Sequence, residues 1–217
     1  MSLVHSRHST APLLFLAIVL VTAACTAAPG APSQAASVGT GSETCPTSQP
    51  VALPRGEIRT VTLDTEKGPI VMEVKADLAP IAAGNFVALA ACRYYDGTVF
   101  HRLVPGFVIQ GGDPTGTGTG GPGYEIQDEP VTTPYLRATI AMARTRAPNS
   151  VGSQFFIVLT DEAGAGLAQT NTYQIIGRVT SGMEAVDAIA AMPNSGSDTG
   201  NMALDPVAIK TATVTNP

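Results

Sequence analysis

The sequence predicts a mainly β fold, a closed antiparallel barrel of eight short strands capped by two α-helices. Two observations lead to this fold class. Short runs of β-branched and aromatic residues recur along residues 56–217, whereas only two segments carry the apolar spacing of an amphipathic helix. The helical segments do not alternate with the strands, which argues against a doubly wound α/β sheet.

The first predicted elements are a β-hairpin and a helix. Residues 58–64 and 69–75 alternate apolar and polar side chains, and the turn between them ends in a glycine. Residues 80–92 begin with Pro80 and repeat apolar side chains at helical spacing, as in Phe86 and Leu89. We therefore expect an amphipathic helix to follow the hairpin.

The remaining elements are six strands and one helix. The predicted strands cover residues 98–104, 107–110, 139–143, 155–160, 173–179 and 207–214. The second helix covers residues 183–192 and ends before Pro193. The glycine-rich stretch 111–123 matches G-x-G-x-x-G, but no helix begins after it, so we interpret it as a loop and not as a nucleotide site.

Charge and histidine content exclude several function classes. Charged residues make up 13% of the chain, against about 25% in ordinary soluble proteins. The net charge of −5 argues against a nucleic-acid partner. Outside the first ten residues the only histidine is His101, which excludes a multi-histidine zinc site. We expect no metal and no cofactor, and any Ser–His or Cys–His pair would have to use His101.

Residues 1–24 have the layout of a signal peptide of the lipoprotein type. A weakly basic start precedes 14 mostly apolar residues, too few to span a bilayer comfortably. Residues 21–25 resemble a bacterial lipobox, except that Thr22 replaces the usual Leu-like residue, and this predicts lipidation of Cys25. The predicted location is extracytoplasmic and membrane-anchored. An uncleaved anchor and a secreted protein are the alternatives.

Residues 25–55 are rich in Ala, Pro, Ser, Gly and Thr, a composition that predicts a disordered tether. Two cysteines remain besides the predicted lipidation site, Cys45 and Cys92. In an oxidising compartment such a pair suggests one disulfide, which would join the end of the tether to the domain. Two free thiols, with Cys92 buried on a helix, remain the alternative.

Two sequence blocks carry the most specific signal. Residues 100–113 read F-H-R-L-V-P-G-F-V-I-Q-G-G-D. The second block reads M-A-R at residues 142–144 and P-N-S-V-G-S-Q-F-F-I, which contains G-S-Q-F-F, at residues 148–157. These blocks resemble the two signature blocks of the cyclophilins, the peptidyl-prolyl cis–trans isomerases, and the similarity extends from about Val61 to Ile209. The resemblance implies that residues 56–217 form an isomerase domain that rotates X–Pro bonds. We expect it to assist the folding of exported proteins.

The resemblance also implies roles for particular residues of the first block. Arg102 is the expected catalytic donor to the prolyl nitrogen. Phe107 and Phe156 are expected to line the proline pocket, with Val108 in place of the usual Met. Gln110 is expected to contact the substrate backbone and to orient the arginine.

The second block supplies the neighbouring subsite. Ala143 matches a small residue beside which the substrate backbone passes. Arg144 stands where Asn is usual, at a position where we expect the peptide to bond to the main chain. Gln154 is expected to support the site from the side. The stretch 144–147 is one residue longer than the common form, which leaves its register open.

Two further pocket residues follow from the same resemblance. Leu167 is the candidate for the pocket wall in the loop 163–169, which is longer than usual and lacks the Trp of many relatives. Tyr173 stands where many relatives have His. The expected partners are proline-containing peptides, unfolded or exported proteins, and the membrane through the lipid anchor. We expect a monomer. The alternative function is a peptide-binding chaperone or adaptor whose isomerase activity is incidental.

Overall fold

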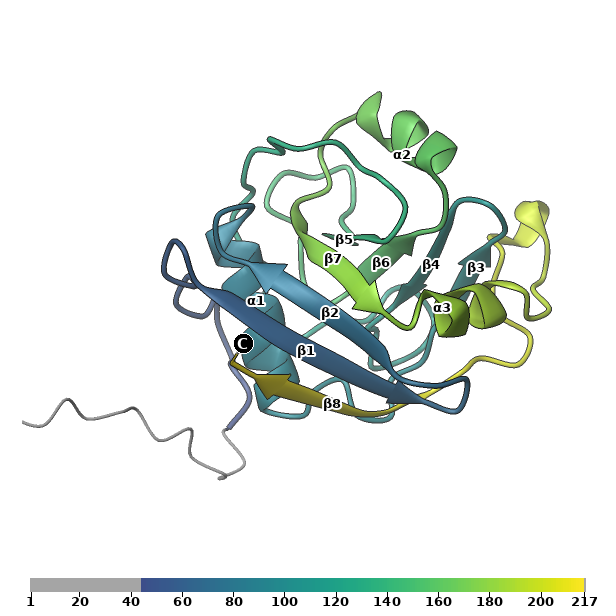
Figure 1. The fold of residues 1–217 in the computed structure, drawn as a ribbon, viewed down its shortest axis with the longest axis horizontal. Helices are drawn as coiled ribbons and strands as arrows, with labels where there is room; N and C mark the ends of the chain where they lie inside the picture. Colours follow the sequence, from purple (N-terminus) through teal and green to yellow (C-terminus); the bar gives the residue numbers. More distant parts are fainter. Residues whose placement is uncertain (1–43, 217) are drawn as a thin grey trace, which may run out of the picture. The chain divides into compact units, whose positions relative to one another are not determined.

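The computed structural model describes residues 44–216, which contain one eight-stranded antiparallel sheet and three α-helices (Figure 1). The sheet curves into a half-barrel with the strand order β3-β4-β6-β5-β7-β2-β1-β8. The strands are β1 (Ile58–Thr65), β2 (Ile70–Lys75), β3 (Arg102–Val104), β4 (Val108–Gly111), β5 (Thr139–Met142), β6 (Phe155–Val158), β7 (Ile175–Ser181) and β8 (Ile209–Thr215). The helices are α1 (Pro80–Ala91), α2 (Asp161–Ala168) and α3 (Met183–Ala190), with a 3-10 turn η1 (Ser197–Thr199).

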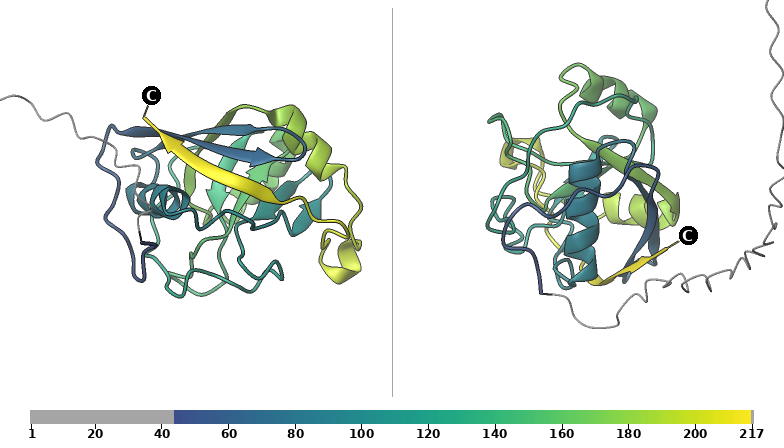
Figure 2. Two further views of the ribbon diagram at one scale, coloured as in Figure 1. Left: turned by 90° about the horizontal axis from the view of Figure 1, so that it is seen from below. Right: turned by 90° about the vertical axis from the view of Figure 1, so that its left-hand side faces the viewer.

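The hairpin predicted from the alternating pattern is confirmed. In β1 the inward-facing side chains of Val61 and Leu63 are fully buried, and they lie opposite Met72 and Ile70 of β2. Because successive side chains of a strand point to opposite faces, these apolar residues share the concave face. β8 pairs with the other edge of β1, and both lie side by side above α1 (Figure 2).

The expected closure of the barrel is not confirmed. β3 and β8 are the two edges of the sheet, and no ladder joins them. The residues just before β3 do contact the start of β8, through an isolated bridge between Val99 and Ala208 and a hydrogen bond from the Ile209 N–H to the Thr98 carbonyl oxygen at 2.8 Å. Beside β3 itself lies the segment between α3 and β8, where the Leu103 N–H donates to the Asn201 carbonyl oxygen at 2.9 Å. Because β3 has three residues, few of its backbone groups remain unpaired once this segment is bonded to it.

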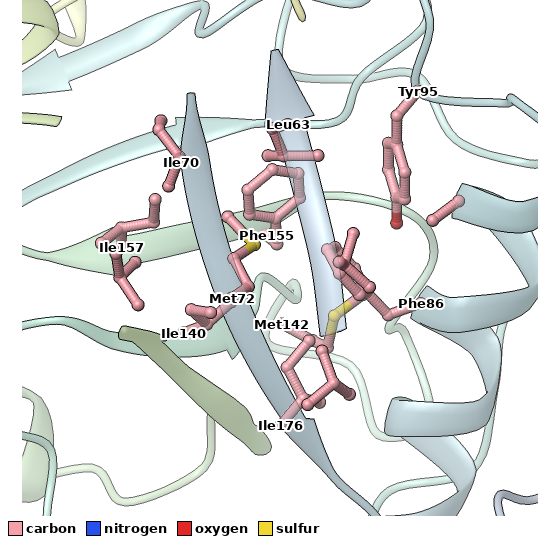
Figure 3. Packing of buried hydrophobic residues seen from close by; sticks show 14 of the residues in the cluster. Leu63, Ile70, Met72, Phe86, Tyr95, Ile140, Met142, Phe155, Ile157 and Ile176 are labelled. Atoms are coloured by element: carbon pink, nitrogen blue, oxygen red, sulfur yellow. The ribbon is translucent and has the colours of Figure 1, made fainter. Parts of the chain in front are cut away.

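Helix α1 provides much of the core. Pro80 occupies its first turn, where the missing N–H costs nothing. The next two N–H groups, of Ile81 and Ala82, donate to the carboxylate of Glu129 at 2.9 Å each. Phe86 projects from α1 between Tyr95 and Phe155, with ring centroids 5.1 and 5.2 Å away (Figure 3). Such offset and edge-on pairs add to the burial energy of the rings.

Helix α2 is a correction, because two helices are predicted and the described residues contain three. The family resemblance predicts a loop over residues 163–169, and Gly164 and Gly166 lower the local helix propensity. The helix is nevertheless capped: the Thr160 hydroxyl accepts from the Ala163 N–H at 3.1 Å. A Cβ on Gly164 would overlap the Tyr135 carbonyl, so this glycine permits the close packing of α2.

The segment 44–55 has no helix or strand, but it packs against the domain. Cys45 and Cys92 form a disulfide, the pairing that the sequence left open. Leu53 is buried, and its N–H donates to the Pro80 carbonyl oxygen at 2.9 Å. Gly84 of α1 leaves the room: a Cβ there would lie 2.6 Å from the Val51 carbonyl oxygen. The predicted tether therefore ends well before residue 55.

The predicted signal peptide, Cys25 and the rest of the tether lie outside the described residues. Within residues 44–216, no helix is long and apolar enough to cross a membrane.

Candidate active site

Strand alternation places side chains from four neighbouring strands in one row on the outer face of the sheet. Arg102 on β3 lies opposite Gln110 on β4. Gln110 in turn lies opposite Phe156 on β6, which lies opposite Ala141 on β5. Leu103, the neighbour of Arg102 along the chain, points into the core instead. The sheet thus sets a cationic, a polar and an apolar side chain side by side.

The guanidinium of Arg102 is held at two points. Its Nη1 donates to Oε1 of Gln110 at 3.3 Å, and its Nε donates to the Gly200 carbonyl oxygen at 3.2 Å. Gly200 has a φ of 82°, a conformation that favours glycine. Within the described part of the chain, no acceptor is bonded to Nη2 of Arg102, so this nitrogen is available to a ligand.

Gln110 is fixed in turn by Gln154. The Gln110 Nε2 donates to the Gln154 Oε1 at 2.9 Å. The Gln154 Nε2 donates to the carbonyl oxygens of Gly118 and Gly120 at 3.0 and 2.9 Å. A continuous chain of hydrogen bonds therefore connects the glycine-rich loop to the guanidinium of Arg102.

That loop is folded around the carboxylate of Asp113, which is fully buried. The carboxylate accepts from the N–H and hydroxyl of Thr115 at 2.8 and 2.9 Å, and from the N–H groups of Gly118 and Gly120 at 2.6 and 3.1 Å. Burial alone would raise the pKa of Asp113, but these hydrogen bonds outweigh it and hold the pKa below its usual value. The glycines thus belong to a loop whose conformation is fixed by hydrogen bonds to the Asp113 carboxylate.

An apolar cluster lies beside this network, on the same outer face. Its members from the predicted site are Phe107, Val108, Phe156, Leu167, Tyr173 and Ala143. Phe156 and Tyr173 meet edge to face with ring centroids 5.3 Å apart. Tyr173 is held by the Tyr135 hydroxyl, which donates to its carbonyl oxygen at 2.8 Å and accepts from its N–H at 3.0 Å. Leu167 reaches the cluster from α2.

A cavity of about 790 Å³ adjoins this network. Gln110 of β4 lines it together with Ala143 and Gln154, which directly follow β5 and precede β6, respectively, and residues 118–125 line it from the loop. Arg144 also contributes to the lining, but its guanidinium forms an ion pair with Asp128 at 3.1 Å and is occupied by the protein.

The groups of acid–base and nucleophilic chemistry are not assembled here. His101 is 2% exposed, and within the described residues its ring nitrogens have no hydrogen-bond partner. Burial lowers the pKa of His101, although the charge of Asp113 opposes this. Ser153 is fully buried and donates to the Gly112 carbonyl oxygen at 2.7 Å. Residues 44–216 contain no group of three or more His, Cys, Asp or Glu side chains placed to hold a metal ion.

The structure brings together nearly all the residues predicted for the site. Arg102, Gln110 and Gln154 form one network, and the predicted pocket residues form one cluster. Arg144 also lines the cavity; its side chain is directed to the protein itself, whereas the peptide is expected to bond to its main chain. Two further contributors, the Gly200 carbonyl and Asp113, were not among the predicted site residues. Asp113 ends the block F-H-R…Q-G-G-D, which was the available signal, whereas nothing in the sequence points to Gly200.

Comparisons with known proteins agree with this geometry. The family model described as "Cyclophilin type peptidyl-prolyl cis-trans isomerase/CLD" matches residues 60–214. Peptidyl-prolyl cis-trans isomerase B of Streptomyces anulatus is 42% identical over 156 residues, covering 62% of this chain and 85% of that protein. Peptidyl-prolyl cis-trans isomerase-like 3 of Dictyostelium discoideum is 37% identical over 159 residues, covering 71% and 94%.

A solved structure gives the same result for the fold. A crystal structure of a Cryptosporidium parvum cyclophilin type peptidyl-prolyl cis-trans isomerase matches with a TM-score of 0.65 and 34% identity. The match covers 74% of this chain and 99% of that one. A second crystal structure of that protein, determined in the presence of the dipeptide Ala-Pro, matches equally well.

Proposed function

Because this chain belongs to the cyclophilin-type peptidyl-prolyl cis-trans isomerases, and is therefore an enzyme, we propose that Arg102 carries its reaction and that its substrates are proline-containing segments of exported proteins. The single observation that carries the catalytic assignment is the row across the sheet. There the fixed guanidinium of Arg102 lies beside the apolar cluster that contains Phe156.

The reaction requires a donor and not a proton carrier. Rotation about an X–Pro amide has a barrier of about 18–20 kcal/mol, which comes from the double-bond character of the C–N bond. A hydrogen bond to the prolyl nitrogen opposes this resonance and favours the pyramidal nitrogen of the twisted state. An acceleration of about 10⁵-fold needs about 7 kcal/mol of preferential transition-state stabilisation. Arginine suits this role because it remains charged at any physiological pH.

The geometry supports this assignment of donor and proline site. Gln110 and Gly200 hold two of the three guanidinium nitrogens of Arg102, which leaves Nη2 to donate to substrate. The cluster of Phe107, Phe156 and Tyr173 offers apolar surface for the ring. Because folding already fixes the position of these groups, they need no reorganisation in the transition state.

The proposed compartment rests on the N-terminal sequence and on the disulfide. A lipoprotein-like signal and the candidate lipidation site Cys25 favour export and anchoring. Disulfides persist mainly in oxidising compartments, so the Cys45–Cys92 bridge supports the same location. The test is metabolic labelling with radioactive palmitate. Label on the wild type and none on Cys25→Ala would support the anchor, and an unlabelled wild type would contradict it.

The catalytic assignment is tested with a protease-coupled X-Pro-Phe peptide assay. We expect Arg102→Ala to lower kcat/KM by about one hundredfold or more, as for removal of a transition-state donor. The control is Arg178→Ala, since Arg178 is an exposed arginine on β7, outside the site. If Arg102→Ala is as fast as the wild type, the assignment fails. If Arg102→Ala loses catalysis yet still protects unfolded clients, the chaperone or adaptor function is favoured instead.

A further inference from the structure

The guanidinium of Arg144 makes contacts with four separate groups. Its Nη2 donates to the Ala147 carbonyl oxygen at 2.7 Å, and its Nε donates to the Thr145 carbonyl oxygen at 3.2 Å. Its Nη1 forms the ion pair with Asp128 at 3.1 Å and lies 3.5 Å from the Thr172 carbonyl oxygen. The side chain of Arg144 is 12% exposed, and its hydrogen bonds to the three carbonyl oxygens lie at the surface of the protein.

These contacts join three segments that are distant in the sequence. Asp128 also binds the loop after Arg144, because its carboxylate accepts from the Asn149 N–H and its own N–H donates to the Asn149 side chain, both at 2.8 Å. Thr172 directly precedes Tyr173, whose ring packs on Phe156. The guanidinium therefore ties the loop 145–149 to Asp128 and to the start of the pocket wall.

We propose that Arg144 is a positioning residue that holds the peptide-binding edge of the site at a fixed distance from the pocket wall. The edge is the main chain at Ala143 and Arg144, which borders the cavity beside Gln154. This inference rests on the proposed function, since it concerns the segment of substrate that precedes the proline. Arg144 touches no reacting atom. It acts on the affinity for the peptide, whereas Arg102 acts on the rotation.

The chemistry of this cluster requires an arginine. Five N–H donors in one plane allow the guanidinium to serve several carbonyl oxygens and a carboxylate at once. A lysine keeps the charge but offers a single nitrogen on a flexible stem. Asp128 depends on the pair as well: its Oδ1 is buried and has no hydrogen-bond partner within residues 44–216. Loss of Arg144 would leave this carboxylate partly buried without its counter-charge.

The test separates binding from rotation. The dissociation constant of an Ala-Ala-Pro-Phe peptide is measured by NMR titration, and the rate of exchange on the enzyme is obtained from the same line shapes. For Arg144→Gln we expect the dissociation constant to rise about tenfold, the scale of one lost charge-assisted hydrogen bond, with an exchange rate within twofold of the wild type. The matched control is Arg146→Gln in the same loop, because Arg146 is exposed and forms no ion pair in the described structure.

Two further variants keep the inference falsifiable. Arg144→Lys should recover part of the affinity, and Asp128→Asn combined with Arg144→Gln should weaken binding by less than the sum of the two single changes, because the two side chains share one ion pair. The inference is overturned if Arg144→Gln binds like the wild type, if it lowers the exchange rate and not the affinity, or if the two substitutions are additive. An inactive wild type in the same experiment would instead refute the proposed function.

Discussion

Asp113→Asn is the most informative single change to the glycine-rich loop. The carboxylate takes two hydrogen bonds on each oxygen, from Thr115 on one and from Gly118 and Gly120 on the other. An amide keeps only one oxygen, so its NH₂ group must replace an acceptor. In the better orientation the Asn NH₂ group faces Thr115. The Thr115 hydroxyl can rotate and accept from this group, but the Thr115 backbone N–H loses its acceptor.

The cost follows from these contacts. One buried N–H without an acceptor costs about 1–3 kcal/mol, and hydrogen bonds that lose a charged acceptor weaken as well. We expect the free energy of unfolding to fall by about 3 kcal/mol, and the Tm by roughly 10 °C for a domain of this size. We also expect kcat/KM to fall about tenfold, because the carbonyl oxygens of Gly118 and Gly120 then hold Gln154 less firmly, and Gln154 in turn holds Gln110.

The pH dependence gives an independent check. The folded pKa of Asp113 lies below its unfolded value of about 3.9, so its charge stabilises the fold above that value. This stabilisation is lost as the pH falls through the folded pKa. The stability difference between wild type and Asp113→Asn should therefore be constant above about pH 5 and narrow below pH 4.

Stability is measured by chemical unfolding of both proteins, and kcat/KM by the peptide assay. The side-chain amide signal of Gln154 in ¹H–¹⁵N spectra reports whether Gln154 is still held in place. The control is Asp64→Asn, since Asp64 is exposed on β1 and should change nothing. Wild-type stability and kcat/KM in Asp113→Asn, or an unchanged Gln154 amide signal, would refute the reasoning.

Two further predictions concern packing and the disulfide. Gly164→Ala should destabilise the protein by about 1–3 kcal/mol in urea unfolding, because the added Cβ would overlap the Tyr135 carbonyl. The control is Gly166→Ala, where the added Cβ meets open space, and it should be neutral or stabilising. Equal effects of the two substitutions would contradict this account. Replacing Cys45 and Cys92 together by Ser should lower stability by up to about 4 kcal/mol, since the bridge closes a separation of 47 residues, while leaving kcat/KM unchanged. Thermal unfolding with and without reductant measures this effect, and a reductant-insensitive wild type would contradict it.

The sequence predicted β1 and β2 well because burial alternates along both strands. Side chains of a strand alternate between two faces, so Val61 and Leu63 both face the core. The same two-residue period makes the apolar pattern visible in the sequence. The closure of the barrel is not confirmed; it depends on what lies beside β3, and the segment around Asn201 has no apolar pattern that signals its place there. Helix α2 was missed because Gly164 serves a long-range contact at the expense of local propensity.

The site shows the same division between local and long-range information. Arg102, Gln110 and Phe156 share a face of the sheet because of strand alternation and register, and the two sequence blocks identify them as a set. The sequence does not reveal that Gly200 accepts from Arg102, or that Arg144 binds Asp128, because each contact joins residues that are remote along the chain. Such contacts become visible only when the chain is folded.

The folded site is organised by two aspartates that do different work. Asp113 shapes the loop that holds Gln154, and through it Gln110 and Arg102, the proposed donor of the rotation step. Asp128 pairs with Arg144 and holds the edge along which the peptide is proposed to bind. Because the two carboxylates support different side chains, their substitution should separate the two halves of catalysis: the Asp113 variant should lower the rate on the enzyme, and the Asp128 variant should weaken binding. An isomerase whose proposed mechanism transfers no proton can thus still depend on one buried and one partly buried carboxylate, because these groups fix the geometry of the site.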